Sequence, residues 1–119
     1  YFSRIAEETA VIVQVETRAA IEQSLDIGKV DGVDGVFFGP ADIAADMGLL
    51  GRPADPAVWE LIRPAARRLT EAGIPVGTLV FDPAFAKSLL AEGFSFVACG
   101  SDAVLLARGA DALLRNVKV

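Results

Sequence analysis

The sequence predicts an α/β fold built around a parallel β-sheet, and three observations support this. Four short apolar runs, typical of strands buried on both faces, occur at residues 11–15, 33–38, 75–81 and 94–99. Segments with helical periodicity or helix-start signals separate these runs. No linker or low-complexity segment interrupts the alternation. Strict alternation of strand and helix indicates parallel strands joined by right-handed crossovers.

The helices are expected between and around these strands, at residues 18–27, 41–47, 56–72, 83–92 and from 100 onward, with the tail of another helix in residues 1–9. Asp55 and Asp82 each precede a proline, so each is expected to cap a helix. The helix over residues 56–72 carries its apolar residues at helical spacing, which predicts a buried stripe of Val58, Leu61, Ile62, Ala65 and Leu69. The last helix is expected to bury Leu106, Ala110, Leu113 and Leu114.

Composition excludes several classes of protein. The 119 residues are 53% hydrophobic and carry a net charge of −5, which suits one cytoplasmic globular domain and argues against a nucleic-acid partner. No apolar stretch approaches the ~20 residues of a membrane span. The single cysteine, Cys99, lies in an apolar run, so it is expected to be a small buried hydrophobe rather than half of a disulfide.

Length indicates that the sheet is incomplete. A (β/α)₈ barrel typically needs ~250 residues, and four strand–helix units in 119 residues are half of that. The only methionine is Met47, and the sequence contains no histidine. We therefore expect residues 1–119 to be part of a longer protein and part of a single domain.

Two acidic residues follow strands at the point where parallel sheets keep their chemistry. Glu16 comes directly after the run at residues 11–15, and Asp42 follows the run at residues 33–38 after a break at Gly39-Pro40. Neighbouring parallel strands bring such carboxylates together, and like charges held close need a cation or a shared proton. The sequence therefore predicts a paired-carboxylate site.

Three segments carry a resemblance to a known family. They are Gln14-Val15-Glu16-Thr17-Arg18, the stretch from Gly32 to Gly48 with Gly39-Pro40-Ala41-Asp42 at its centre, and Phe96-Val97-Ala98-Cys99-Gly100-Ser101-Asp102. In order and spacing the chain resembles the HpcH/HpaI aldolases, the class II aldolases of 2-keto-3-deoxy sugar acids. The resemblance implies a TIM barrel, with this chain as its C-terminal half. It also implies reversible cleavage of a 2-oxo-4-hydroxy acid to pyruvate and an aldehyde.

The resemblance further implies a divalent metal held by Glu16 and Asp42, either Mg²⁺ or Mn²⁺, with Co, Ni and Zn as alternatives. The backbone N–H groups of Ala41 and Asp42, after Gly39 and Pro40, are expected to bind the pyruvate carboxylate. Gln14 lies on the same side of its strand as Glu16 and is expected either to contact the keto oxygen or to be a satisfied polar group of the barrel. Leu79 is expected to line the aldehyde pocket, with Val80.

Other residues are given structural roles. Arg18 is expected to form a salt bridge, Asp46 to be a solvated or helix-pairing acid, Asp82 and Asp102 to cap helices, and Trp59 to pack in the core. The loop at residues 48–56 is expected to lie beside the site, as a mobile or subunit-facing segment.

Two other functions stay open at this point. One is a CoA-ester lyase of the citrate lyase β type, and the other is a non-catalytic half-barrel that serves in assembly. Catalysis by the aldolase is also expected to need a histidine and an arginine from outside this chain, so the 119 residues alone are expected to be inactive. A homo-oligomer is also expected. The open edges of the sheet are expected to pair with the missing half or with another copy of this chain.

Overall fold

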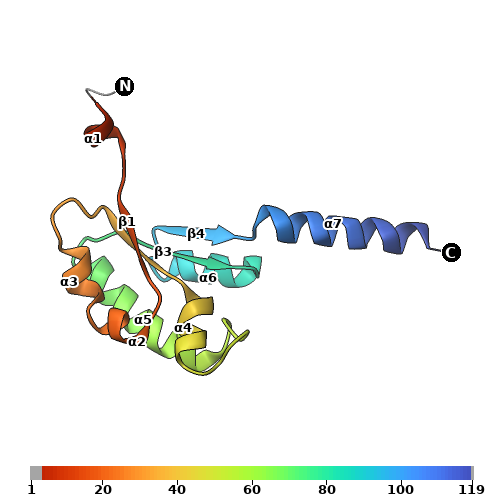
Figure 1. The fold of residues 1–119 in the computed structure, drawn as a ribbon, viewed down its shortest axis with the longest axis horizontal. Helices are drawn as coiled ribbons and strands as arrows, with labels where there is room; N and C mark the ends of the chain where they lie inside the picture. Colours follow the sequence, from red (N-terminus) through yellow and green to blue (C-terminus); the bar gives the residue numbers. More distant parts are fainter. Residues whose placement is uncertain (1–3, 119) are drawn as a thin grey trace.

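The computed structural model describes residues 4–118, which form a four-stranded parallel sheet with helices between successive strands (Figure 1). Strands β1 (Ile12–Val15), β2 (Gly35–Phe38), β3 (Val76–Val80) and β4 (Phe96–Cys99) lie in the order β1-β2-β3-β4. The helices are α1 (Ile5–Glu8), α2 (Arg18–Glu22), α3 (Ser24–Gly28), α4 (Pro40–Asp46), α5 (Pro56–Glu71), α6 (Pro83–Ala91) and α7 (Asp102–Val117). The predicted parallel α/β sheet is therefore confirmed.

Helices cover one face of this sheet, and the core lies between them and the strands (Figure 1). The alternate residues Val76, Thr78 and Val80 of β3 point into it. The hydroxyl of Thr78, fully buried, donates a hydrogen bond of 3.0 Å to the carbonyl of Phe38 on the neighbouring strand. Helix α5 contributes Val58, Trp59, Ile62, Ala65, Ala66 and Leu69. The predicted stripe is thus confirmed except for Leu61, which is 36% exposed.

The opposite face of the sheet carries a row of residues that no helix covers. Register pairs Gln14 with Phe37, Phe37 with Gly77, and Gly77 with Phe96, so these four residues share one level and one face. The Phe37 and Phe96 rings stack across Gly77 at 6.1 Å between centroids. A face of this kind, apolar and uncovered, is the one that would line the interior of a closed barrel.

The two edge strands are less buried than the sequence predicts. In β1 only Val15 is buried, and β4 has no buried residue. The prediction that Cys99 is buried is wrong, because its side chain is exposed. An apolar run indicates a strand, but burial on both faces requires neighbours on both sides, and β1 and β4 each have a strand on one side only.

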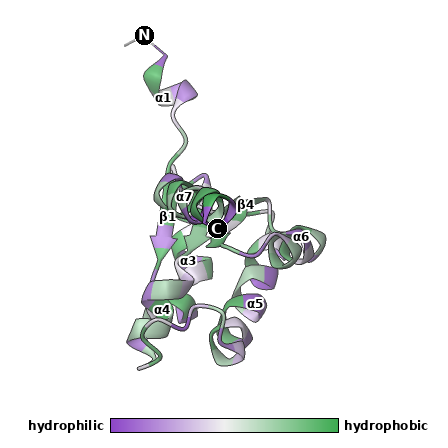
Figure 2. Ribbon diagram, turned by 90° about the vertical axis from the view of Figure 1, so that its right-hand side faces the viewer, coloured by the Kyte–Doolittle hydropathy of each residue, from purple (hydrophilic) through white to green (hydrophobic). Residues whose placement is uncertain are grey.

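Helix α7 projects away from the sheet (Figure 1). None of its residues is buried, so the predicted buried stripe of Leu106, Ala110, Leu113 and Leu114 is wrong for this chain. Leu106 is 76% exposed and Leu113 66%. Figure 2 looks along this helix, and its ribbon is green at the hydrophobic residues. The radius of gyration is 17.0 Å, against about 13.5 Å for a compact domain of this length.

Local signals at the helix ends were read correctly in most places. Asp55 and Asp82 cap α5 and α6 by accepting hydrogen bonds of 3.0 and 2.9 Å from backbone N–H groups two residues ahead. At α7 the cap is Ser101 rather than Asp102. The helix predicted over residues 18–27 is two helices, because the backbone at Gln23 has ψ of 1° and interrupts the first helix there. None of the described helices is long and apolar enough to cross a membrane.

Gly77 should be required for the stacked rings on the open face. A Cβ built on Gly77 would lie 2.0 Å from Cε2 of Phe96, so alanine here must displace that ring. We expect Gly77→Ala to lower the free energy of unfolding by about 1–3 kcal/mol, measured by urea denaturation of the whole protein. Gly109→Ala is the matched control, because a Cβ there meets no atom within 4 Å. It should be neutral or stabilising, and equal effects of the two substitutions would contradict the packing argument.

Candidate active site at the carboxyl edge of the sheet

A cavity of about 420 Å³ opens at the carboxyl ends of the strands. Its lining comes from β1, β2, β3, α4, α5, α6, α7 and the loops between them: Gln14, Phe37, Gly39, Pro40, Ala41, Asp42, Pro53, Ala54, Trp59, Leu79, Val80, Phe81, Asp82, Phe85 and Arg108. Six residues predicted for the substrate site from the sequence (Gln14, Gly39, Pro40, Ala41, Asp42 and Leu79) are among them. Open α/β sheets bind their ligands at this edge, so the cavity is the candidate site.

Glu16 is held beside the cavity by the residues next to it. Its Oε1 accepts a hydrogen bond of 2.7 Å from the Nε2 of Gln14, two positions back on β1. Gly39 lies against the same carboxylate: a Cβ on Gly39 would be 3.1 Å from the Glu16 Cγ and 3.4 Å from Oε1. The absence of a side chain at Gly39 therefore leaves room for Glu16, and the hydrogen bond from the Gln14 amide holds its carboxylate in place.

Asp42 lies in the first turn of α4. The N–H of Gly39 donates to the carbonyl of Val15 at 2.9 Å, which extends the β1–β2 pairing to the start of this helix. Pro40 occupies the first position of α4, and the N–H groups of Ala41 and Asp42 belong to the first turn, where no intrahelical acceptor exists. Glu16 and Asp42 thus both follow neighbouring parallel strands at the same edge of the sheet.

An ion pair ties the helices behind these acids together. Arg18, at the start of α2, donates from its backbone N–H and its Nε to Oδ2 of Asp46, both at 3.0 Å, and from Nη2 to the Asp46 carbonyl at 3.1 Å. These hydrogen bonds, the one from the backbone N–H first, hold the pKa of Asp46 below its usual value. The predicted structural roles of Arg18 and Asp46 are confirmed, and the pair positions α2 relative to α4.

Glu16 and Asp42 are the two acids that the sequence predicts as ligands of a cation. Among residues 4–118, no group of three or more histidine, cysteine, aspartate or glutamate side chains is close enough to hold a metal ion. Glu16 and Asp42 would therefore leave most positions around a six-coordinate cation to water and to oxygens of a bound substrate.

The far wall of the cavity is aromatic, and its place at the site was not predicted from the sequence. Trp59 is predicted as a core residue, and it is only 2% exposed, but it also lines the cavity. Its ring meets that of Phe85 edge-on at 4.7 Å, and the Arg63 guanidinium lies 5.6 Å from the Phe85 ring and 6.0 Å from the Trp59 ring. Arg63 also pairs with Glu92 in two hydrogen bonds of 2.8 and 3.1 Å.

The loop between α4 and α5 is attached to this wall. The indole N–H of Trp59 donates a hydrogen bond of 2.9 Å to the carbonyl of Pro53, and Pro53 and Ala54 line the cavity. The loop at residues 48–56 therefore lies beside the candidate site, as predicted; its mobility and its predicted subunit contacts stay predictions. One feature of the sequence could have predicted that Trp59 lies at the site: it is close to the start of a helix, directly after the loop at residues 48–56.

Removing the indole N–H should loosen this loop. Trp59→Phe keeps an aromatic ring beside Phe85 and deletes the donor to Pro53. We expect the free energy of unfolding to fall by about 1–2 kcal/mol, because a partly buried carbonyl loses its partner and some side-chain volume is lost. Urea denaturation of the whole protein measures this, and an unchanged free energy of unfolding would contradict a holding role for the hydrogen bond.

These features define a class of protein: a parallel α/β domain of barrel type with a cavity at the carboxyl edge of its strands, lined in part by Asp42. A model of the family described as HpcH/HpaI aldolase/citrate lyase matches residues 2–109. The chain belongs to this family, as the resemblance in its sequence indicates.

Individual relatives agree with this assignment. A 4-hydroxy-2-oxo-heptane-1,7-dioate aldolase from Salmonella arizonae is 47% identical over 113 residues, which are 95% of this chain and 43% of that protein. The crystal structure of a family member from Burkholderia cenocepacia J2315 superposes with a TM-score of 0.86 at 32% identity, covering 95% of this chain and 44% of that one. An HpcH/HpaI aldolase from Desulfitobacterium hafniense DCB-2 superposes with a TM-score of 0.78 at 28% identity, covering 96% and 45%.

The chain thus spans less than half the length of the relatives it matches. Its four strand–helix units are about half of the TIM barrel of this family, which agrees with the fold class predicted from the sequence.

Proposed function

We propose that residues 1–119 are the C-terminal half of a single barrel domain, and that the whole protein is a divalent-metal-dependent aldolase. The reaction is the reversible cleavage of a 2-oxo-4-hydroxy acid to pyruvate and an aldehyde. Family membership supports the reaction type. The single structural observation that carries the proposal is the oriented carboxylate of Glu16, held by Gln14 and fitted against Gly39, at the edge of a cavity that also contains Asp42.

The residues present fit a hard divalent cation. A side chain at Gly39 would fill the space beside the Glu16 carboxylate, and the two acids offer the oxygen ligands that Mg²⁺ and Mn²⁺ prefer. We propose Mg²⁺ or Mn²⁺, held by Glu16 and Asp42. Such a cation, when bound, would act as a Lewis acid that stabilises the negative charge developing on the keto oxygen as the carbon–carbon bond breaks.

This chain's own groups would bind and orient the substrate. The first-turn N–H groups of Ala41 and Asp42 are free to donate to the carboxylate of a 2-oxo acid, and the helix N-terminus favours negative charge there. One N–H of the Gln14 amide is committed to Glu16, which leaves the second to contact the keto oxygen. Leu79 would lie against the aldehyde portion.

The proton of the 4-hydroxyl must go to a group that this chain does not supply. The sequence has no histidine, and the two acids of the site would be committed to the cation. A general base working near neutral pH is therefore expected from the other half of the barrel. We also propose that the whole protein is a homo-oligomer and acts in the cytoplasm, where Cys99 would stay reduced.

The test is pyruvate release by the whole protein. Purified enzyme, stripped with a chelator and then supplied with Mg²⁺ or Mn²⁺, should release pyruvate from a 4-hydroxy-2-oxo acid only when the cation is present. A parallel assay with a β-hydroxyacyl- or citryl-CoA ester distinguishes the CoA-ester lyase of the citrate lyase β type. Turnover of the CoA ester alone would overturn the aldolase assignment, and turnover of neither substrate would favour a non-catalytic module.

A further inference from the structure

The ion pair of Arg18 and Asp46 joins the two segments that carry the proposed metal ligands. Arg18 is the first residue of α2 and follows Glu16 by two positions. Asp46 is the last residue of α4 and lies four positions, about one helical turn, after Asp42. Neither Arg18 nor Asp46 is among the described residues that line the cavity. The pair is therefore close to both acids along the chain, but it lies outside the site itself.

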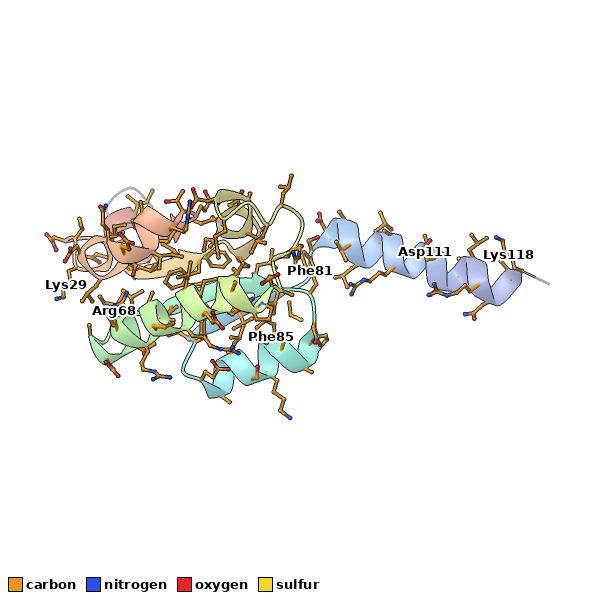
Figure 3. The ribbon with its side chains drawn as sticks, turned by 90° about the horizontal axis from the view of Figure 1, so that it is seen from below. Lys29, Arg68, Phe81, Phe85, Asp111 and Lys118 are labelled. Atoms are coloured by element: carbon orange, nitrogen blue, oxygen red, sulfur yellow. The ribbon has the colours of Figure 1, made fainter. Side chains whose placement is uncertain are left out.

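Helix α4 is attached to the β1–α2 segment at both of its ends. At its start, the N–H of Gly39 donates a hydrogen bond of 2.9 Å to the carbonyl of Val15. At its end, Oδ2 of Asp46 accepts two hydrogen bonds of 3.0 Å from the backbone N–H and the Nε of Arg18, and the Asp46 carbonyl accepts a third, of 3.1 Å, from Nη2. Figure 3 shows α2 and α4, in pale orange and olive, on the same side of α5, with Phe85 of α6 on the other side. A helix held at both ends cannot pivot about one of them, so the ion pair fixes the direction of α4.

The position of Asp42 depends on how α4 is held. This helix has only seven residues, so its own hydrogen bonds give it little stability and its surroundings decide where it lies. Core packing holds one side of it, through the buried residues Pro40, Ile43 and Ala44. Asp42 and Asp46 are both exposed and, four positions apart, lie on the same side of the helix. A shift of α4 would therefore carry Asp42 with it and change its separation from Glu16.

We infer that Arg18 and Asp46 are positioning residues that fix the spacing of the Glu16 and Asp42 carboxylates, and thereby favour a small cation over a large one. This inference rests on the proposed metal site. Mg²⁺ requires near-ideal octahedral geometry with ligands at about 2.0–2.1 Å, whereas Ca²⁺ accepts a flexible set of oxygens at about 2.3–2.6 Å. Loss of a fixed spacing should therefore weaken the binding of Mg²⁺ more than the binding of Ca²⁺.

The experiment is calorimetric titration of the metal-free whole protein with Mg²⁺ and, separately, with Ca²⁺. The measured quantity is the ratio of the Kd for Ca²⁺ to the Kd for Mg²⁺. Asp46→Ala removes the acceptor of two of the three hydrogen bonds. We expect it to raise the Kd for Mg²⁺ about 10- to 100-fold and to lower the ratio about tenfold, as for other groups that orient metal ligands.

A second variant, Arg18→Met, deletes the side-chain donors and keeps the backbone one, so it should lower the ratio less. The double variant should resemble Asp46→Ala alone, because the two side chains act through one contact. The Arg18 and Asp46 side chains are 61% and 33% exposed, and an ion pair this exposed contributes little to the free energy of unfolding. Each variant should therefore fold, which circular dichroism checks.

Glu92→Gln is the matched control. It breaks the ion pair of Arg63 with Glu92, which is similarly exposed and has a Nε–Oε2 distance of 2.8 Å, and it removes one negative charge, as Asp46→Ala does. The ratio should stay at the wild-type value.

Two results would overturn the inference and leave the proposed function intact. A pure charge effect would act on both divalent cations alike: Asp46→Ala would weaken both, Arg18→Met would strengthen both, and the ratio would not change. A general loss of structure would weaken the binding of both cations equally and would also leave the ratio unchanged. Wild-type protein that binds neither cation would instead contradict the proposed metal site, and the inference would fall with it.

Discussion

Asp42→Asn in the whole protein should lower metal-dependent pyruvate release by at least about 10³-fold. The physical reason is that only two carboxylates, Glu16 and Asp42, are proposed to hold the cation, and asparagine replaces an anionic ligand by a neutral one. Stabilisation of the developing enolate by a bound cation contributes several kcal/mol to the rate, and each 1.36 kcal/mol is a factor of ten. The assay is pyruvate release at saturating Mg²⁺ or Mn²⁺, together with the metal affinity from calorimetry.

Asp26→Asn provides the control for this substitution. Asp26 is an exposed acid of α3 that does not line the cavity. Its replacement by asparagine makes the same change in charge as Asp42→Asn. Its activity should equal that of the wild type. Circular dichroism and denaturation of the Asp42 variant would separate loss of the metal from loss of the fold. If Asp42→Asn kept normal cleavage and the same sensitivity to chelators, the assignment of Asp42 as a metal ligand would be wrong.

The 119-residue chain alone should not cleave a 2-oxo-4-hydroxy acid, and it should self-associate. Its sequence has no histidine, so it lacks the expected general base, and excess Mg²⁺ or Mn²⁺ cannot replace that group. The edge strands β1 and β4 have unpaired sides, and the open face exposes Phe37 and Phe96 in part. Helix α7 adds exposed leucines, with Leu105 64% and Leu106 76% exposed. Unpaired edges and apolar patches of this kind promote association.

Light scattering and a pyruvate assay on the purified chain measure both effects. Adding the other half of the barrel, with its expected histidine and arginine, should restore activity and reduce self-association, because the two halves close the sheet and cover the open face. Substitution of Leu106 and Leu113 by glutamate is a useful comparison, since it should reduce association of the isolated chain without creating activity. A monodisperse monomer of the unchanged chain that releases pyruvate at an enzymatic rate would contradict this prediction.

The sequence by itself determined the order of elements and the position of the two acids. Apolar runs separated by Asp-Pro helix starts and glycine ends are local signals, and local signals do not depend on what the rest of the chain does. For this reason the caps at Asp55 and Asp82 and the stripe of α5 were predictable. The parallel sheet followed from strict alternation, and the placement of Glu16 and Asp42 at one edge followed from the parallel sheet.

Burial was decided only by the tertiary structure. The apolar runs of β1 and β4 and the amphipathic α7 resemble buried elements, yet each is exposed on at least one side, because burial depends on which neighbours the chain supplies. Cys99 is exposed for the same reason. The sequence pattern indicates which residues favour burial. In this chain some of those residues have no neighbouring element that buries them.

The far wall of the site also required the structure. Trp59, Phe85 and Arg108 are distant in sequence, and no spacing rule links them. They meet at the cavity because α5, α6 and α7 all begin at the same edge of the sheet. The acids of the site follow their strands directly, so a sequence can locate them. The side chains of Trp59, Phe85 and Arg108 come from helices, and only the packing of those helices brings them to the cavity.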